Sequence, residues 1–199
     1  MWDERYAGDD YVYGTAANDF LKAAVAGVPL GRALCLAEGE GRNAVFLAGL
    51  GFDVLAVDSS AVGLRKAERL ARERGVHIET LVADLADYRI EPGAWDLIVS
   101  IFCHLPPPIR RCLHHEVVAG LRPGGVFILE AYTPAQLQRG TGGPPTAELA
   151  MSLEALTDEL DGLEFEHAVE LERDVIEGRF HTGRGAVVQI LAHKPASDW

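Results

Sequence analysis

Glycine and acidic residues stand where three apolar runs of the sequence end. Gly39 and Gly41 follow the first run, and Asp58 and Asp84 follow two later ones. Glycines at such a point let the backbone approach a ligand beside the positively polarised start of a helix. A carboxylate at a neighbouring strand end can accept hydrogen bonds from ribose hydroxyls, and a second one can read an adenine amino group. The pattern predicts a site for an adenosine-containing cofactor.

Each of these features has another interpretation when it is taken alone. The spacing Gly39-x-Gly41-x-x-Ala44 also fits the dinucleotide fingerprint, so an NAD-dependent oxidoreductase stays open. Asp58 could instead cap the helix that follows it, and Asp84 could stabilise a turn. A non-catalytic module that binds the cofactor without reacting is the third reading.

The elements that would position these residues alternate between strand and helix. Apolar runs predict strands at residues 33–37, 54–57, 77–82, 97–101 and 125–131. Helical periodicity predicts helices at residues 17–26, from 41 onward, 60–75 and 107–121. Strands separated by helices form parallel βαβ units, so we expect a doubly wound α/β sheet with helices on both faces.

The last part of the chain follows a different pattern. After a loop rich in glycine and proline at 140–145 and a helix at 152–160, two long strands are expected at 164–175 and 185–193. The connection of residues 176–184 is too short for a crossover, so this pair is antiparallel.

An aromatic and acidic segment, residues 1–14, precedes the first expected helix. Its aromatic residues are Trp2, Tyr6, Tyr11 and Tyr13. We expect it to act as a lid on a single domain, in which residues 15–133 form the cofactor-binding half. Residues 134–199 would add the loop, the helix and the antiparallel pair.

Composition narrows the partners and the compartment. The chain has 199 residues, 48% of them apolar, which suits one packed domain. Its net charge of −12 disfavours nucleic acid and anionic membrane surfaces. No apolar run reaches the ~18 residues that span a bilayer, and Met1–Arg5 is too polar for a signal peptide, so we expect a cytoplasmic protein. Three cysteines without a C-x-x-C pair predict no disulfide framework and no metal site, with Cys35 and Cys112 buried.

Several motifs together resemble the class I S-adenosylmethionine-dependent methyltransferases. They are, in chain order, Ala33–Asn43, Ala56–Asp58, Ala83–Leu85, Trp95–Ser100 and Leu121–Gly125. Three more resemble the branch that includes the tellurite-resistance methyltransferases: Trp2–Tyr6, Tyr11–Gly14 and Ile101–Pro106. The resemblance implies S-adenosylmethionine as the cofactor and a small-molecule methyl acceptor. It also implies a seven-stranded sheet whose last strand is inserted antiparallel.

The same resemblance implies which residues contact the cofactor. They are Tyr13, Glu38, Gly39, Gly41, Arg42, Asn43, Asp58, Ser59, Asp84, Leu85, Ser100 and Ile101. Within this set Asp58 would hold the ribose, Asp84 the adenine, and Ser100 the methionine portion. Cys35 stands where the family has an acid and Ala37 where it has a glycine, so we expect Glu38 to meet the cofactor's amino group instead.

The acceptor implied by the resemblance is a small, soft nucleophile, such as a thiol or a chalcogen oxyanion. No carboxylate pair or metal-ligand cluster follows the strand at 97–101 to activate a poorer nucleophile. His104 is the candidate general base, with a packed structural histidine as the alternative. His181 and Arg184, in the expected hairpin turn, could contact an anionic acceptor or simply be solvated.

Overall fold

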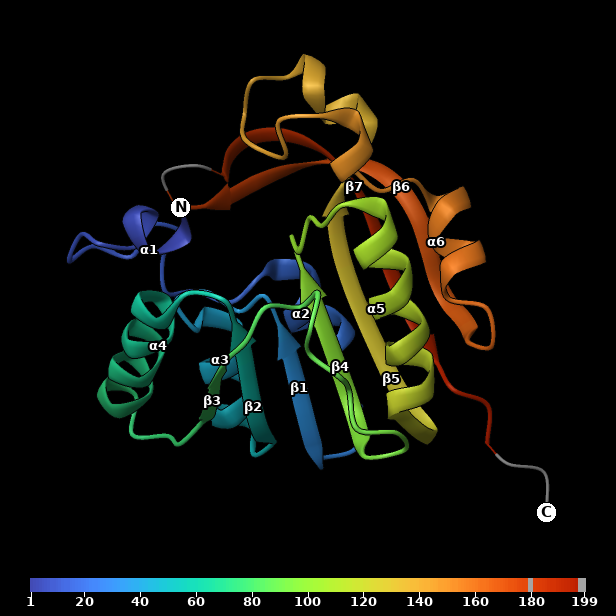
Figure 1. Ribbon diagram of the computed structural model, residues 1–199, viewed down its shortest axis with the longest axis horizontal. Helices are drawn as coiled ribbons and strands as arrows, with labels where there is room; N and C mark the ends of the chain where they lie inside the picture. The colour runs from blue at the N-terminus through green and yellow to red at the C-terminus, as the bar shows by residue number, and fades with distance from the viewer. Residues whose placement is uncertain (179–180, 197–199) are drawn as a thin grey trace.

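The computed structural model describes residues 1–178 and 181–196, and within them one mixed sheet runs through the molecule (Figure 1). Its seven strands lie in the order β3-β2-β1-β4-β5-β7-β6. Their bounds are β1 (Arg32–Leu36), β2 (Asp53–Asp58), β3 (Glu79–Val82), β4 (Trp95–Ile101), β5 (Leu121–Tyr132), β6 (Glu164–Glu177) and β7 (His181–His193). The first five strands pair in parallel, and β7 lies antiparallel between β5 and β6. The predicted sheet, with its antiparallel last strand, is confirmed.

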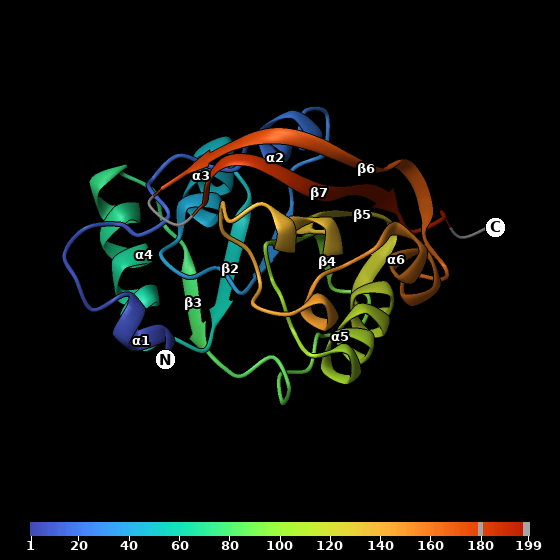
Figure 2. The ribbon, with the colours of Figure 1, turned by 90° about the horizontal axis from the view of Figure 1, so that it is seen from above.

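Helices cover both faces of this sheet (Figure 2). The α-helices are α1 (Trp2–Arg5), α2 (Asp19–Ala24), α3 (Arg42–Leu50), α4 (Ala61–Glu73), α5 (Pro107–Gly120) and α6 (Leu153–Glu159), and the 3-10 helices are η1 (Pro134–Gln138) and η2 (Ala147–Leu149). α2, α3 and α4 contribute to one apolar cluster, and α5 and α6 to another. In β1, Leu34 and Leu36 belong to one cluster while Ala33 and Cys35 belong to the other. Burial on both faces explains why central strands such as β1 and β4 are almost continuously apolar.

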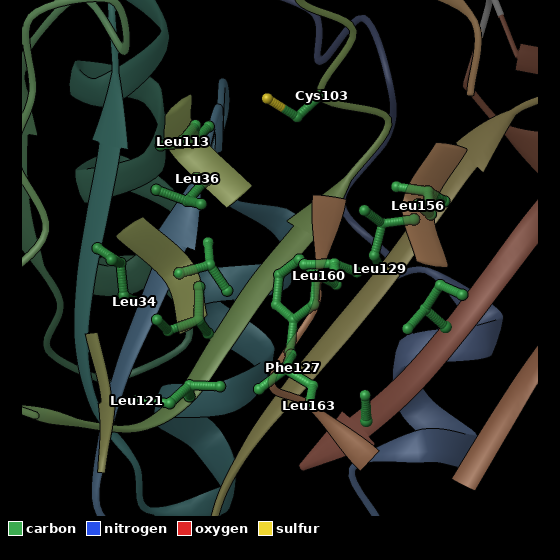
Figure 3. Packing of buried hydrophobic residues seen from close by; sticks show 14 of the residues in the cluster. Leu34, Leu36, Cys103, Leu113, Leu121, Phe127, Leu129, Leu156, Leu160 and Leu163 are labelled. Carbon is green, nitrogen blue, oxygen red and sulfur yellow. The ribbon is translucent and has the colours of Figure 1, made fainter. Parts of the chain in front are cut away.

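The core beneath α5 and α6 combines apolar packing with a buried ion pair. Figure 3 shows Leu129 of β5 beside Leu156 of α6 and Phe127 of β5 beside Leu160, which ends α6, and all four side chains are fully buried. The Arg110 guanidinium of α5 lies 2.7 Å from the Glu159 carboxylate at the end of α6. These contacts fix α6, and therefore the start of β6, against the sheet.

The C-terminal hairpin is longer than the sequence predicts. β7 begins at His181 and not at residue 185, because pairing continues to Glu177 opposite His181. Gly178, with a φ of 75°, takes the left-handed conformation that glycine adopts without penalty where the chain reverses. The connection continues through residues 179–180, which lie outside the described residues. His181 and Arg184 are therefore strand residues, and their odd spacing places the two side chains on opposite faces.

A buried ionic network holds this hairpin over the sheet. Glu130 of β5 is fully buried and accepts hydrogen bonds from Arg173 of β6 at 2.7 and 2.6 Å. Arg173 also bonds Glu177, which in turn pairs with Arg42 at the start of α3. Asn18 donates to both Glu130 and Glu177, at 2.6 and 2.8 Å. The hairpin is thus tied to the residues that follow the glycine turn.

Two expectations about the surface have different outcomes. Cys112 is exposed, contrary to the prediction, because α5 turns Leu113 and Val117 toward the core and Cys112 away from it. Cys35 is buried as predicted. Among the described residues, every helix is too short or too polar to cross a membrane.

Candidate functional site

Strand register brings the predicted site residues to one edge of the sheet. Leu36 of β1 pairs with Val57 of β2 on one side and with Ser100 of β4 on the other. Asp58 pairs with Val82 of β3. The segments that leave these strands therefore start side by side, as the sequence analysis expects of parallel strands.

Asp58 organises the loops at this edge. Its carboxylate is only 7% exposed and accepts hydrogen bonds from the backbone N–H groups of Gly39 and Ser60, both at 2.8 Å. Burial raises the pKa of this carboxyl above its usual range. An ionised carboxylate offers about four acceptor positions, so capacity remains for the two hydroxyls of a ribose. The residues present at this strand end fit an adenosine cofactor.

Glu38 is engaged in the start of α3. Its Oε1 accepts hydrogen bonds from the N–H groups of Asn43 at 2.9 Å and Ala44 at 2.8 Å. Burial raises the pKa of Glu38 to about 7. The Cys35 thiol lies against this carboxylate, and burial and then the charge of Glu38 raise its pKa well above the ordinary value. Glu38 thus satisfies the free N–H groups of a helix start, and its predicted contact with the cofactor's amino group stays a prediction.

The two glycines of the turn allow close packing. Gly41 has a φ of 88°, and a Cβ added there would lie 2.3 Å from the Cβ of Ala67 on α4. Gly39 has a φ of 62°, and its added Cβ would lie 2.7 Å from the Tyr6 hydroxyl. The cofactor is expected to lie against the backbone of these glycines. The structure adds that they let α4 and residues 1–14 approach the turn from its other sides.

Backbone strain is concentrated at the same edge. Among the described non-glycine residues, only Ala37 and Phe102 have positive φ angles, of 51° and 53°. Ala37 directly follows the end of β1, and Phe102 directly follows the end of β4. A left-handed conformation costs a residue with a side chain roughly 1–2 kcal/mol, and such strain gathers at functional sites.

Arg42 and Asn43, predicted beside the cofactor, bind other parts of the chain. Arg42 is 8% exposed and pairs with Glu177 of the hairpin. The Asn43 Oδ1 accepts a hydrogen bond from the backbone N–H of Asn18 at 2.9 Å. Arg42 therefore holds the C-terminal hairpin against the turn, and Asn43 holds the residue that precedes α2 against it.

The predicted adenine side is more open. Asp84 is exposed, and its carboxylate accepts a hydrogen bond from the Ala86 N–H at 2.9 Å. Leu85 is buried in the core, and Ser59 is exposed next to Asp58. The Ala83 N–H donates to the Asp58 carbonyl at 3.0 Å, which brings the loop that carries Asp84 close to Asp58.

Aromatic side chains from four parts of the chain meet beyond the end of β4: residues 1–14, the residues that follow β4, the end of β5 and the start of β7. We define the aromatic cluster as Tyr13, Phe102, Tyr132 and His181. The ring centroids of Phe102 lie 4.6 Å from Tyr132 and 4.8 Å from His181, and those of Tyr13 and His181 lie 4.7 Å apart. Ser100 and Ile101, expected beside the methionine portion, are buried where β4 leads into this cluster. Arg184 lies outside it, exposed and beside Glu172.

His104 borders the aromatic cluster with both ring nitrogens engaged. Nδ1 lies 2.9 Å from the Leu149 carbonyl, and Nε2 lies 3.3 Å from the backbone N–H of Tyr132. Since Nε2 accepts a hydrogen bond from the Tyr132 N–H, Nδ1 carries the ring hydrogen and donates it to the Leu149 carbonyl, and the imidazole is neutral. Burial lowers the pKa of His104 to about 4. The ring joins η2 to the end of β5 in this arrangement.

His104→Ala is therefore expected to reduce methyl transfer less than about tenfold on an acceptor that arrives ionised. Its main effect should be on stability, with a loss of about 1–3 kcal/mol for two backbone groups left unpaired. Steady-state kinetics and urea unfolding measure the two effects. His115→Ala, on the exposed side of α5, is the control and should change neither. A loss of activity of a thousandfold with a folded protein would make His104 the general base.

Sequence reasoning missed three residues of this region. Tyr6 is buried against Gly39, while Glu40 and Lys66 form a buried ion pair between the turn and α4. Tyr6 belongs to the aromatic segment, which hinted at such a role. Nothing local marked Lys66, since it stands in an ordinary amphipathic helix and its partners lie on other segments.

Comparison with known proteins identifies the domain. Residues 33–125 match the family model described as a methyltransferase domain. The matched region holds the glycine turn, Asp58, Asp84 and the end of β4. The matched residues are therefore those of a methyltransferase domain, and the fold agrees with that of the class I S-adenosylmethionine-dependent methyltransferases. The cofactor predicted from the residues at the strand ends is the one this family uses.

A curated relative and two solved structures resemble this methyltransferase domain. Over 80 residues the chain is 35% identical to a carboxy-S-adenosyl-L-methionine synthase from Trichlorobacter lovleyi, a match that covers 39% of this chain and 33% of the relative. The chain thus spans about a third of the length of that relative. A structure described under the conversion of a disulfide bond into a thioacetal group during echinomycin biosynthesis has a TM-score of 0.77, with 20% identity over 98% of this chain and 89% of the other. TehB from Haemophilus influenzae has a TM-score of 0.72, with 20% identity over 97% of this chain and 65% of the other.

Proposed function

We propose that this chain transfers the methyl group of S-adenosylmethionine to a small, soft nucleophile, such as a thiol or a chalcogen oxyanion. The observation that carries the proposal is the chemistry of the aromatic cluster and its border. Four ionisable side chains there, those of Cys103, His104, Tyr132 and His181, have their pKa moved away from neutrality in the direction that makes each a poor base or a protonated acid.

The individual groups support this point. Burial, followed by the charge of Arg42, lowers the pKa of His181 to about 3. Burial raises the pKa of Cys103 to about 12 and raises that of Tyr132 above its usual range. Neither these groups nor the hydrogen-bonded His104 can readily remove a proton from an acceptor. The acceptor must therefore arrive already ionised, or be nucleophilic without losing a proton.

When bound, S-adenosylmethionine supplies a methyl group on a sulfonium, which is already activated for displacement. The protein then has to hold the cofactor, align the acceptor and exclude water. Asp58 would hold the ribose, and Phe102 and Tyr132 would wall the acceptor side. Arg42, the cation with the largest effect on the pKa of His181, would supply positive charge for an anionic acceptor. Arg184 lies outside the aromatic cluster, beside Glu172 and Asp174, and is not assigned this role.

Two further considerations support a soft, small acceptor. One similar structure is described by a reaction at sulfur, and another is TehB, a tellurite-resistance protein. The net charge of −12 disfavours a nucleic acid substrate. We place the reaction in the cytoplasm, where small thiols stay reduced.

A pH–rate comparison with two thiols of different acidity tests the proposal. Without an enzyme base, kcat/KM should rise with pH along the thiol pKa of each acceptor, so the two profiles should be displaced from each other. Production of S-adenosylhomocysteine is the measurement, with selenite, tellurite, a phenol and an amine as further acceptors. One shared inflection near neutral pH would show an enzyme base, and turnover on oxygen or nitrogen acceptors alone would overturn the choice of acceptor. Binding of NAD without S-adenosylhomocysteine would favour the oxidoreductase reading.

A further inference from the structure

The segment of residues 1–14 wraps around one buried ammonium group. The Nζ of Lys66, on α4, donates to the carbonyls of Tyr6 at 3.3 Å, Gly8 at 2.9 Å and Asp10 at 2.7 Å. Lys66 is 7% exposed, so these carbonyls replace the water that would otherwise surround its charge. Three alternate carbonyls directed at one cation fix the path of the whole loop.

The same lysine reaches the glycine turn through Glu40. Glu40 stands between Gly39 and Gly41, is 4% exposed, and forms an ion pair with Lys66 through its Oε1. Its other oxygen accepts hydrogen bonds from the backbone N–H groups of Val12 at 2.8 Å and Tyr13 at 3.4 Å. One carboxylate on the turn thus binds both the lysine and the far end of the loop.

These contacts determine what must break when residues 1–14 leave the turn. Lys66 would lose three carbonyls, Glu40 would lose two N–H groups, and Tyr6 would leave its position on Gly39. A buried charge that loses its partners is unfavourable until water reaches it, so the loop is held as a unit. Tyr13, at the end of the loop, contacts His181 of the aromatic cluster.

We propose that Lys66 and Glu40 form a latch that holds residues 6–13 closed over the glycine turn, and that this latch sets how long the cofactor stays bound. Both are positioning residues, because they act through the loop and the turn. The inference rests on the cofactor site described above. It assigns a role that neither residue has from the methyltransferase motifs.

Lys66→Met is the main test, since methionine keeps the length of the side chain and removes the charge. Release of S-adenosylhomocysteine, followed by stopped-flow displacement, should become at least about tenfold faster. Trypsin cleavage after Arg5, followed by mass spectrometry without any cofactor, should also become faster. The KM for S-adenosylmethionine should rise more than kcat falls. Lys66→Arg keeps a charge and several donors, so its release rate and its cleavage rate should return part of the way to the wild-type values.

Two controls separate a latch from a general loss of stability. Lys22→Met removes an exposed lysine that pairs with Asp19 and should change nothing. Arg110→Met removes a buried cation that bonds Glu159 and the carbonyls of Glu148 and Ala150, far from residues 1–14 in the sequence. It should lower the melting temperature and leave the release rate and the cleavage after Arg5 unchanged.

The double variant Lys66→Met/Glu40→Gln leaves no unpaired buried charge, which protects the test against misfolding. Folded Lys66→Met or double-variant protein with the wild-type release rate and cleavage rate overturns the latch. Faster release that Arg110→Met reproduces in full also overturns it. Wild-type protein that binds no S-adenosylhomocysteine contradicts the proposed function, while the cleavage measurement still tests the latch.

Discussion

Asp58→Ala is expected to weaken the binding of S-adenosylhomocysteine at least tenfold, about 1.4 kcal/mol. Two losses add in this variant. The ribose hydroxyls lose a charged acceptor, and the N–H groups of Gly39 and Ser60 lose the carboxylate that now holds them at 2.8 Å. The second loss lets the turn change shape before any ligand binds. Isothermal titration calorimetry measures the effect directly.

Asp84→Ala and Asp53→Ala complete this experiment. Asp84 is exposed, and its hydrogen bond to Ala86 lies within its own loop, so its removal should weaken binding less than the loss of Asp58. Asp53 is an exposed acid at the opposite end of β2 and should have no effect. Equal affinities in all three variants would contradict the placement of the adenosine pocket.

The fold could be predicted because most of its strands are visible as short apolar runs in the local sequence. Runs such as Val126–Leu129 are apolar on both faces, and only a sheet covered on both sides buries them. The antiparallel end of the sheet followed from a connection too short for a crossover. The length of the hairpin could not be predicted in the same way. It depends on Glu177 and Arg173 being held by Glu130 and Arg42, which come from other parts of the chain.

The candidate site could be predicted as a position but not as a set of contacts. Strand ends fix where Asp58 and Ser100 lie, because parallel register brings those ends together. The partner of a long side chain depends on residues far away in the sequence. Arg42 binds a hairpin residue 135 positions later, and Lys66 binds carbonyls 56 to 60 positions earlier. No local sequence pattern therefore indicates that Arg42 holds the hairpin, or that Lys66 holds residues 1–14, against the glycine turn.

Gly41→Ala is expected to lower the free energy of unfolding by about 3 kcal/mol or more. A side chain at a φ of 88° is strained in itself. The new Cβ would also lie 2.3 Å from the Cβ and 2.6 Å from the Cα of Ala67, and the backbone of α4 cannot yield as a flexible side chain would. Either α4 moves outward, which disturbs Lys66 one position earlier, or the turn changes conformation. Urea unfolding followed by circular dichroism gives the difference.

Gly49→Ala is the matched control on the same helix. Gly49 also belongs to α3, but its added Cβ would meet nothing within 4 Å, and its φ is not in the left-handed region. Alanine is the better helix former by about 1 kcal/mol, so this variant should be as stable as the wild type or more so. If Gly41→Ala matched Gly49→Ala in stability, the close contact between the turn and α4 would not exist in solution. A loss confined to Gly41→Ala would show that this glycine is needed for α3 and α4 to pack, whether or not a cofactor is bound.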